Sequence, residues 1–181
     1  MGAEKALLAL AGRPLIAHVV ERLRPQVDMV FINANGEPAR FASLDCPIVA
    51  DASQAGVAGP LVGIRAALVF ARSHGLARLA TAPCDAPFLP LDLVSRLDAA
   101  MTASGAPAAA AQRASGLEPM FALWSLRAES EIIAECARNE ASPRAVLERL
   151  GAARVLFADD GDPFANINRP QDLTAAEARL R

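Results

Sequence analysis

The residue whose surroundings indicate chemistry most clearly is Asp85. It lies in the proline-rich turn 83–90, directly after the short apolar run 79–82. A carboxylate at the carboxyl end of a parallel strand sits where open α/β sheets bind their ligands. Mg²⁺ binds one or two protein oxygens together with substrate phosphates. We therefore expect a metal-assisted reaction on a phosphate-bearing substrate, while an Asp-x-Pro turn that only ends a strand remains the simpler explanation.

Four other segments carry groups that can contact a nucleotide, and each has an ordinary structural explanation beside it. Lys5 can place an ammonium against a phosphate, or it is a surface lysine. Asn33 follows the apolar run 27–32 and suits either hydrogen bonds to a base or ribose, or a turn. Asp51 follows a second short strand and is either a nucleotide or metal ligand, or a helix cap. Segment 59–63 opens a helix whose free N–H groups attract anions, or it is a simple loop-to-helix junction.

Composition and charge limit the class of protein. The chain has 181 residues, of which 53% are hydrophobic, and a formal net charge of -2. It is long enough for one domain with a core, and it lacks the positive charge of a nucleic-acid binder. No apolar stretch is long enough to span a bilayer. The cysteines are isolated, which argues against a disulfide framework or a zinc cluster. We expect a single domain over residues 1–181, in the cytoplasm, with no nucleic-acid or membrane partner.

The elements that must position these residues alternate along the chain. Strands are predicted at 27–32, 47–50, 79–82, 106–112, 118–124 and 154–157, although the alanines of 106–112 have low strand propensity. Helices are predicted at 14–26, from 59–60 to about 75, 91–102, 126–138, 143–150 and from about 170, with Asn168 as a candidate cap. This alternation predicts a three-layer α/β/α domain on a mostly parallel sheet.

Taken together, several short motifs resemble the bacterial molybdenum cofactor guanylyltransferases, in order and over nearly the whole chain. The first matching piece is a signature made of Met1-Gly2, Lys5, Leu7-Leu8 and Gly12-Arg13-Pro14-Leu15. The other five are Asn33-Ala34-Asn35, Asp51, Gly59-Pro60-Leu61-Val62-Gly63, Pro83-Cys84-Asp85-Ala86-Pro87 and Asn166-Ile167-Asn168-Arg169-Pro170. Each piece is weak alone, but six in register are specific. The resemblance implies a Rossmann-like nucleotidyltransferase domain.

The resemblance also implies an activity and roles for particular residues. The family transfers GMP from GTP to molybdopterin or its metal-bearing form and releases pyrophosphate. Molybdoenzyme-maturation proteins are possible transient partners. Residue by residue, the resemblance implies four nucleotide contacts, which are Lys5, Asn33, Asp51 and Asp85. It also implies that Asp85 and Lys5 are catalytic and that Asp85 holds Mg²⁺. It places Asn166, Asn168 and Arg144 on the pterin side.

One departure from the family pattern concerns the start of the chain. The family has a central strand and an L-A-G-G-x-x-x-R loop before the Met-Gly pair that stands here as Met1-Gly2. That glycine loop cradles phosphates through backbone N–H groups. We therefore expect a chain that is truncated at its N-terminus relative to the family. Two rivals follow: a cytidylyl- or sugar-nucleotide transferase of the same fold, and a non-catalytic nucleotide-binding remnant that lacks the phosphate loop.

Overall fold

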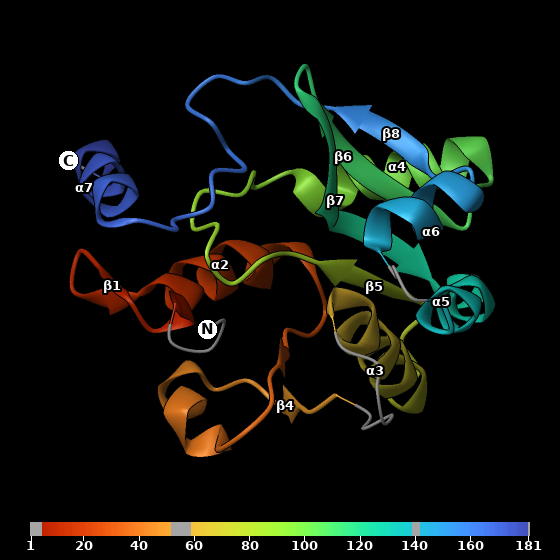
Figure 1. Ribbon diagram of the computed structural model, residues 1–181, viewed down its shortest axis with the longest axis horizontal. Coiled ribbons are helices and arrows are strands. Elements are labelled where there is room, and N and C mark those ends of the chain that lie inside the picture. Colours follow the sequence, from red (N-terminus) through yellow and green to blue (C-terminus); the bar gives the residue numbers. More distant parts are fainter. Residues whose placement is uncertain (1–4, 52–58, 139–141, 181) are drawn as a thin grey trace.

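The computed structural model describes residues 5–51, 59–138 and 142–180 (Figure 1). Its larger sheet has the strand order β5-β7-β6-β8, made of β5 (Arg78–Thr81), β7 (Gly116–Ser125), β6 (Ala108–Arg113) and β8 (Ala153–Leu156). Strands β5, β6 and β8 run in one direction, and β7 runs against them. The reversal of β7 departs from the predicted parallel order because only two residues separate it from β6, and such a short turn joins antiparallel strands.

Helices cover both faces of this sheet, which confirms the predicted α/β/α class. On one face lie α3 (Pro60–Ser73), α5 (Glu129–Cys136) and α6 (Pro143–Arg149), and on the other α4 (Leu93–Ser104) and part of α2 (Leu15–Leu23). Along β7, Ala122 and Trp124 point to the first face while Phe121 and Leu123 point to the second. This alternation is the two-residue period of a strand that is buried on both sides.

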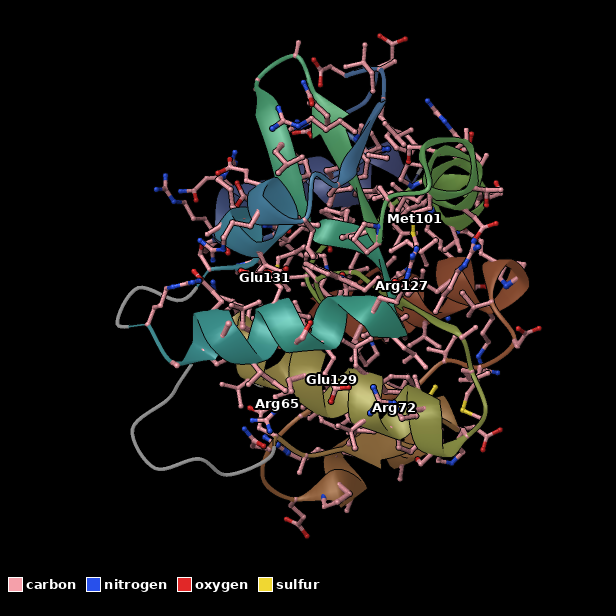
Figure 2. All side chains as sticks on the ribbon, turned by 90° about the vertical axis from the view of Figure 1, so that its right-hand side faces the viewer. Arg65, Arg72, Met101, Arg127, Glu129 and Glu131 are labelled. Atoms are coloured by element: carbon pink, nitrogen blue, oxygen red, sulfur yellow. The ribbon has the colours of Figure 1, made fainter. Side chains whose placement is uncertain are left out.

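The alanine-rich strand β6 forms despite the low strand propensity of alanine. Residues 108–111 are fully buried, at 0% exposure, and alternate between the two faces of the sheet. Their small side chains lie beside the large Trp124 and Phe121 of β7, so tertiary packing outweighs local preference. Figure 2 shows α5 lying along α3, where Arg72 of α3 and Glu129 of α5 form an ion pair.

Two smaller sheets stand beside the larger one. Strand β3 (Ile32–Asn33) pairs in parallel with β4 (Ile48–Val49), and β1 (Ala9–Leu10) forms a hairpin with β2 (Arg13–Pro14). The strand predicted over residues 27–32 was too long, because the ladder with β4 covers only two residues on each side. The paired residues still direct Asn33 and the chain after Val49 to the same end of this sheet.

The C-terminal part of the chain returns across the molecule after β8. Phe164 packs against Phe121 and Phe157, with ring centroids 4.6 and 5.3 Å away, and Ile167 is buried among residues of β1, α2 and α7 (Pro170–Arg179). Figure 1 shows α7 near β1 and far from β8, which places residues late in the chain near its start. Within the described ranges, no helix is both long and apolar enough to cross a membrane.

Three short 3₁₀ helices complete the described structure: η1 (Arg24–Gln26), η2 (Pro38–Leu44) and η3 (Leu126–Ala128). The helix predicted over 14–26 is therefore α2 followed by η1, and Pro25 explains the change because it cannot donate a backbone hydrogen bond. Helix α3 begins at Pro60, as predicted from Gly59-Pro60, with Gly59 at φ 124°. That backbone angle is open to glycine and strained for other residues.

Candidate active site

Asp85 lies just beyond the carboxyl end of β5, as the sequence predicts. Its carboxyl is half-buried, and burial raises its pKa, whereas a backbone hydrogen bond and the nearby Lys5 ammonium lower it. The Ile167 amide donates a 2.8 Å hydrogen bond to the Asp85 carbonyl, which ties this turn to the C-terminal segment. The carboxylate at the end of β5 therefore lies close enough to the Lys5 ammonium for the two charges to interact.

Lys5 stands in a helical turn at the start of the described chain. Its Nζ donates a 2.7 Å hydrogen bond to Oδ1 of Asn168. The Asn168 backbone is itself anchored, because its amide donates to the Asp172 carboxylate at 2.9 Å. Asn168 was predicted as the cap of the C-terminal helix; that prediction was wrong, since the N-cap residue is Arg169 and Asn168 contacts Lys5 instead.

A second group of polar side chains gathers where β3 and β4 end. Asn33 Nδ2 donates to Asp51 Oδ1 at 3.0 Å, and Asn35 Nδ2 donates to Asp51 Oδ2 at 2.7 Å. Asn33 Nδ2 also reaches the Val49 carbonyl at 3.0 Å. Both carboxylate oxygens of Asp51 are thus held by amides from the neighbouring strand end. We call these three residues the Asn33–Asn35–Asp51 cluster.

Helix α3 packs directly against this cluster at Gly63. A Cβ built at Gly63 would overlap Oδ1 of Asn33 and lie 3.1 Å from its Cγ, and it would be 3.2 Å from Asp51 Oδ1. No side chain fits there unless Asn33 moves. Gly63 therefore allows α3 to approach the cluster closely. The sequence predicted only that segment 59–63 either attracts anions or is a simple loop-to-helix junction, and it did not predict this packing role.

A cavity of about 980 Å³ lies between α2, α3, α4 and β5. Its walls come from the segment before β3, from β5 and from helices α2, α3 and α4, and they are largely apolar. Asn33 and Asp85 both line it. Asp51 is hydrogen-bonded to Asn33, and the Lys5 charge lowers the pKa of Asp85, so each cavity-lining residue has one of the other two predicted nucleotide contacts beside it.

Comparison with known proteins shows the family of this chain. Residues 1–155 match the family model of the MobA-like NTP transferase domain. The chain belongs to this family. It is 43% identical over 180 residues to a molybdenum cofactor guanylyltransferase of Cereibacter sphaeroides, covering 99% of this chain and 90% of that protein. It is 45% identical over 183 residues to one from Rhodobacter capsulatus, covering 100% of this chain and 90% of that protein. The chain is accordingly a nucleotidyltransferase.

Solved structures share the fold of this nucleotidyltransferase. Molybdopterin-guanine dinucleotide biosynthesis protein A from Archaeoglobus fulgidus aligns with a TM-score of 0.74 at 24% identity, over 98% of this chain and 90% of that one. A 4-diphosphocytidyl-2C-methyl-D-erythritol synthase aligns with a TM-score of 0.71 at 15% identity, over 99% of this chain and 96% of that one. At these identities the alignments support the Rossmann-like fold and carry no further conclusion about substrate.

The donor set at Asp85 suits a hard cation such as Mg²⁺. Among the described residues, no three His, Cys, Asp or Glu side chains gather into a metal-binding group, so a cation at Asp85 would share its coordination with substrate phosphates. The neighbouring Cys84 is a poor candidate for a nucleophile, because burial and then the Asp85 charge raise the pKa of its thiol. These observations favour Asp85 over Cys84 as the side chain of the turn that serves the chemistry, as a cation ligand.

The residues predicted for the pterin side separate into two places. Asn168 contacts Lys5, and the exposed Asn166 lies next to Ile167, whose amide binds Asp85. Arg144 stands apart in the first turn of α6, where it donates to the Leu117 carbonyl at 2.9 Å. The structure therefore places Asn168 beside Lys5 and Asn166 one residue before the segment that is bonded to the Asp85 turn, and it leaves Arg144 on the helix that packs against β6 and β7. The Met1-Gly2 part of the family motif lies outside the described residues.

Proposed function

We propose that this nucleotidyltransferase transfers GMP from GTP to molybdopterin or to its metal-bearing form, with Mg²⁺ and with release of pyrophosphate. The observation that carries the proposal is that Asn33 and Asp85 line one cavity, with Asp51 hydrogen-bonded to Asn33 and the Lys5 ammonium near Asp85. The names of the relatives from Cereibacter and Rhodobacter support the choice of guanylyl transfer. We retain the prediction of a cytoplasmic protein that can meet molybdoenzyme-maturation proteins.

The reaction needs no nucleophile from the protein. The terminal phosphate of the pterin substrate attacks the α-phosphorus of GTP, the bond from this phosphorus to the bridging oxygen breaks, and pyrophosphate leaves. The protein has to align the two phosphates and balance their charge, which is what catalysis of phosphoryl transfer mainly requires. Mg²⁺, when bound at Asp85, would neutralise charge on the phosphate oxygens.

Particular side chains take particular parts in this proposal. Lys5 supplies a positive charge to the phosphates, and Asn168 orients its ammonium through the 2.7 Å hydrogen bond. Asn33 and Asp51 supply the polar surface for the nucleoside. Asn166 lies at the same edge of the site, where it can meet the pterin substrate. Arg144 is left out of the proposed site because its hydrogen bond to Leu117 holds it on α6.

The test measures dinucleotide formation from molybdopterin with GTP or CTP as the nucleotide. We expect GTP to be used and Asp85→Ala to lose most of the turnover, because the cation loses its protein ligand. Asp92→Ala is the matched control, since Asp92 is an exposed aspartate just before α4 that pairs with Arg96 at 3.7 Å and makes no capping hydrogen bond with its side chain. Preference for CTP would favour the cytidylyl rival. Wild-type turnover by Asp85→Ala would refute the role of Asp85.

A further inference from the structure

Asn35 makes more hydrogen bonds within the cluster than its position in a turn requires. Its Nδ2 donates to Asp51 Oδ2 at 2.7 Å, and its Oδ1 accepts from the Asp51 backbone amide at 2.9 Å. One side chain therefore binds both the carboxylate and the backbone of the same residue. This reciprocal pair joins the chain after β3 to the chain after β4, beyond the last rung of their ladder.

The backbone of Asn35 is fixed from the opposite side by Arg40. Arg40 Nη2 donates to the Asn35 carbonyl at 2.7 Å, and Arg40 Nε donates to the Glu37 carbonyl at 3.1 Å. These bonds close the loop between β3 and η2 around one guanidinium group. The Arg40 hydrogen bonds thus hold the loop that carries the Asn35 amide. An amide held in place orients its partner, here Asp51, better than a mobile one.

Two amides divide the Asp51 carboxylate between them. Asn33 takes Oδ1 and Asn35 takes Oδ2, so the carboxylate plane is defined by two donors that come from one strand end. Asn33 cannot take over the second oxygen as well, because its Nδ2 also serves the Val49 carbonyl and its Oδ1 faces Gly63. Loss of Asn35 would leave the Asp51 carboxylate held at Oδ1 alone, with no donor to define the place of Oδ2.

We propose that Asn35 is a positioning residue that sets the orientation of the Asp51 carboxylate for the nucleotide. The inference rests on the proposed function, in which Asp51 contacts GTP. Asn35 acts through Asp51 and through no contact of its own. Its removal should therefore weaken nucleotide binding only while Asp51 is present, whereas a general structural role would weaken binding whichever residue stands at position 51.

The experiment is a double-mutant cycle on GTP affinity, measured by calorimetry in the full chain with Mg²⁺. We expect Asn35→Ala to weaken binding by about tenfold, the fold-change that loss of one hydrogen bond to a charged group gives. Asn35→Ala should add no further loss in an Asp51→Ala background. Glu37→Ala is the control on the same loop, and its affinity should match that of the wild type. Unchanged affinity of Asn35→Ala, or losses that simply add, would overturn the inference.

A ligand-free measurement separates this inference from the proposed function. In ¹⁵N NMR spectra of the free protein, the proton shifts of the Asn33 side-chain amide should change in both Asn35→Ala and Asp51→Ala. The first change loosens the carboxylate that Asn33 binds, and the second removes it. Glu37→Ala should leave these shifts unchanged. If the wild type does not bind GTP but the spectra change in this way, the proposed function fails and the positioning role stands. If the Asn33 amide is unaffected by Asn35→Ala, the positioning role fails.

Discussion

Replacement of Gly63 by alanine tests how α3 and the Asn33–Asn35–Asp51 cluster depend on each other. The added Cβ would overlap Oδ1 of Asn33, while an ordinary carbon–oxygen contact is about 3.3–3.6 Å. The amide must therefore withdraw by roughly 1 Å. Its hydrogen bonds to Val49 and Asp51, both 3.0 Å long, would then exceed hydrogen-bonding distance.

Two effects of opposite sign determine the stability of Gly63→Ala. Alanine in place of glycine inside a helix stabilises by about 0.8–1.0 kcal/mol. Loss of the two Asn33 hydrogen bonds costs about 0.5–1.5 kcal/mol each, with the lower end favoured because Asn33 is exposed and water can replace its partners. We therefore expect a net change from near zero to a loss of about 2 kcal/mol. In an Asn33→Ala background the clash is absent, and Gly63→Ala should stabilise by about 0.5–1 kcal/mol.

The assay is urea unfolding of the four proteins of this cycle, with GTP affinity measured on each. Gly63→Ala should weaken GTP binding as strongly as Asn33→Ala does, since both remove the amide from Asp51. Val69→Ala is the control for helix propensity, because Val69 is half exposed on the same helix. If Gly63→Ala changes the free energy of unfolding equally in the wild-type and Asn33→Ala backgrounds, a clash between the new Cβ and Asn33 does not destabilise the protein, and the prediction is wrong.

Three further predictions follow from burial and charge. Burial raises the pKa of Asp85, so the folded protein binds its proton more tightly than the unfolded chain does. The free energy of unfolding should therefore fall as pH rises above the usual aspartate pKa. Asp85→Asn should remove this fall in urea unfolding between about pH 4 and 8, and it should not be less stable than the wild type at neutral pH. Burial raises the pKa of the Cys84 thiol, so Cys84 should react with iodoacetamide at neutral pH more slowly than glutathione does. The reaction should be slower still in Lys5→Met, because the Lys5 charge lowers that pKa. A Cys84 rate equal to or above that of glutathione would contradict the first expectation, and a Lys5→Met rate equal to or above that of the wild type would contradict the second. Glu135 is 2% exposed and pairs with arginines of α6 and of the segment after α5, so Glu135→Ala should lower the free energy of unfolding by about 1–3 kcal/mol, and a loss below about 0.5 kcal/mol would show that the network contributes little.

The layered architecture could be predicted from local patterns. Apolar runs of strand length, helical spacing of apolar residues and breakers such as Gly59-Pro60 are short-range signals that act within a few residues. They placed α3, β5 and the turn at Asp85 close to where the structure has them. The strand over 106–112 was expected against its propensity and was confirmed as β6, since burial on both faces favours small side chains beside Trp124.

Other features depend on partners far away along the chain and could not be predicted. The ladder of β3 ends after two residues because β4 offers no longer partner. Asn168 was interpreted as a cap from its position before Pro170, but it serves Lys5, which is 163 residues away. Asn35 looked like a turn residue, and its spacing two positions after Asn33 was the one signal that both side chains could lie on the same side.

The order of the elements, the two apolar faces of the sheet and the kinds of side chain at each strand end follow from periodicity and local backbone preference, so they can be predicted from the chain alone. Which of those side chains meet depends on how the elements pack. The pairs Lys5–Asn168 and Asn35–Asp51 and the approach of Gly63 to Asn33 form where separate elements pack together. Such contacts depend on where whole elements lie relative to one another. Burial of the apolar core sets this placement, and the polar residues that come into contact do not.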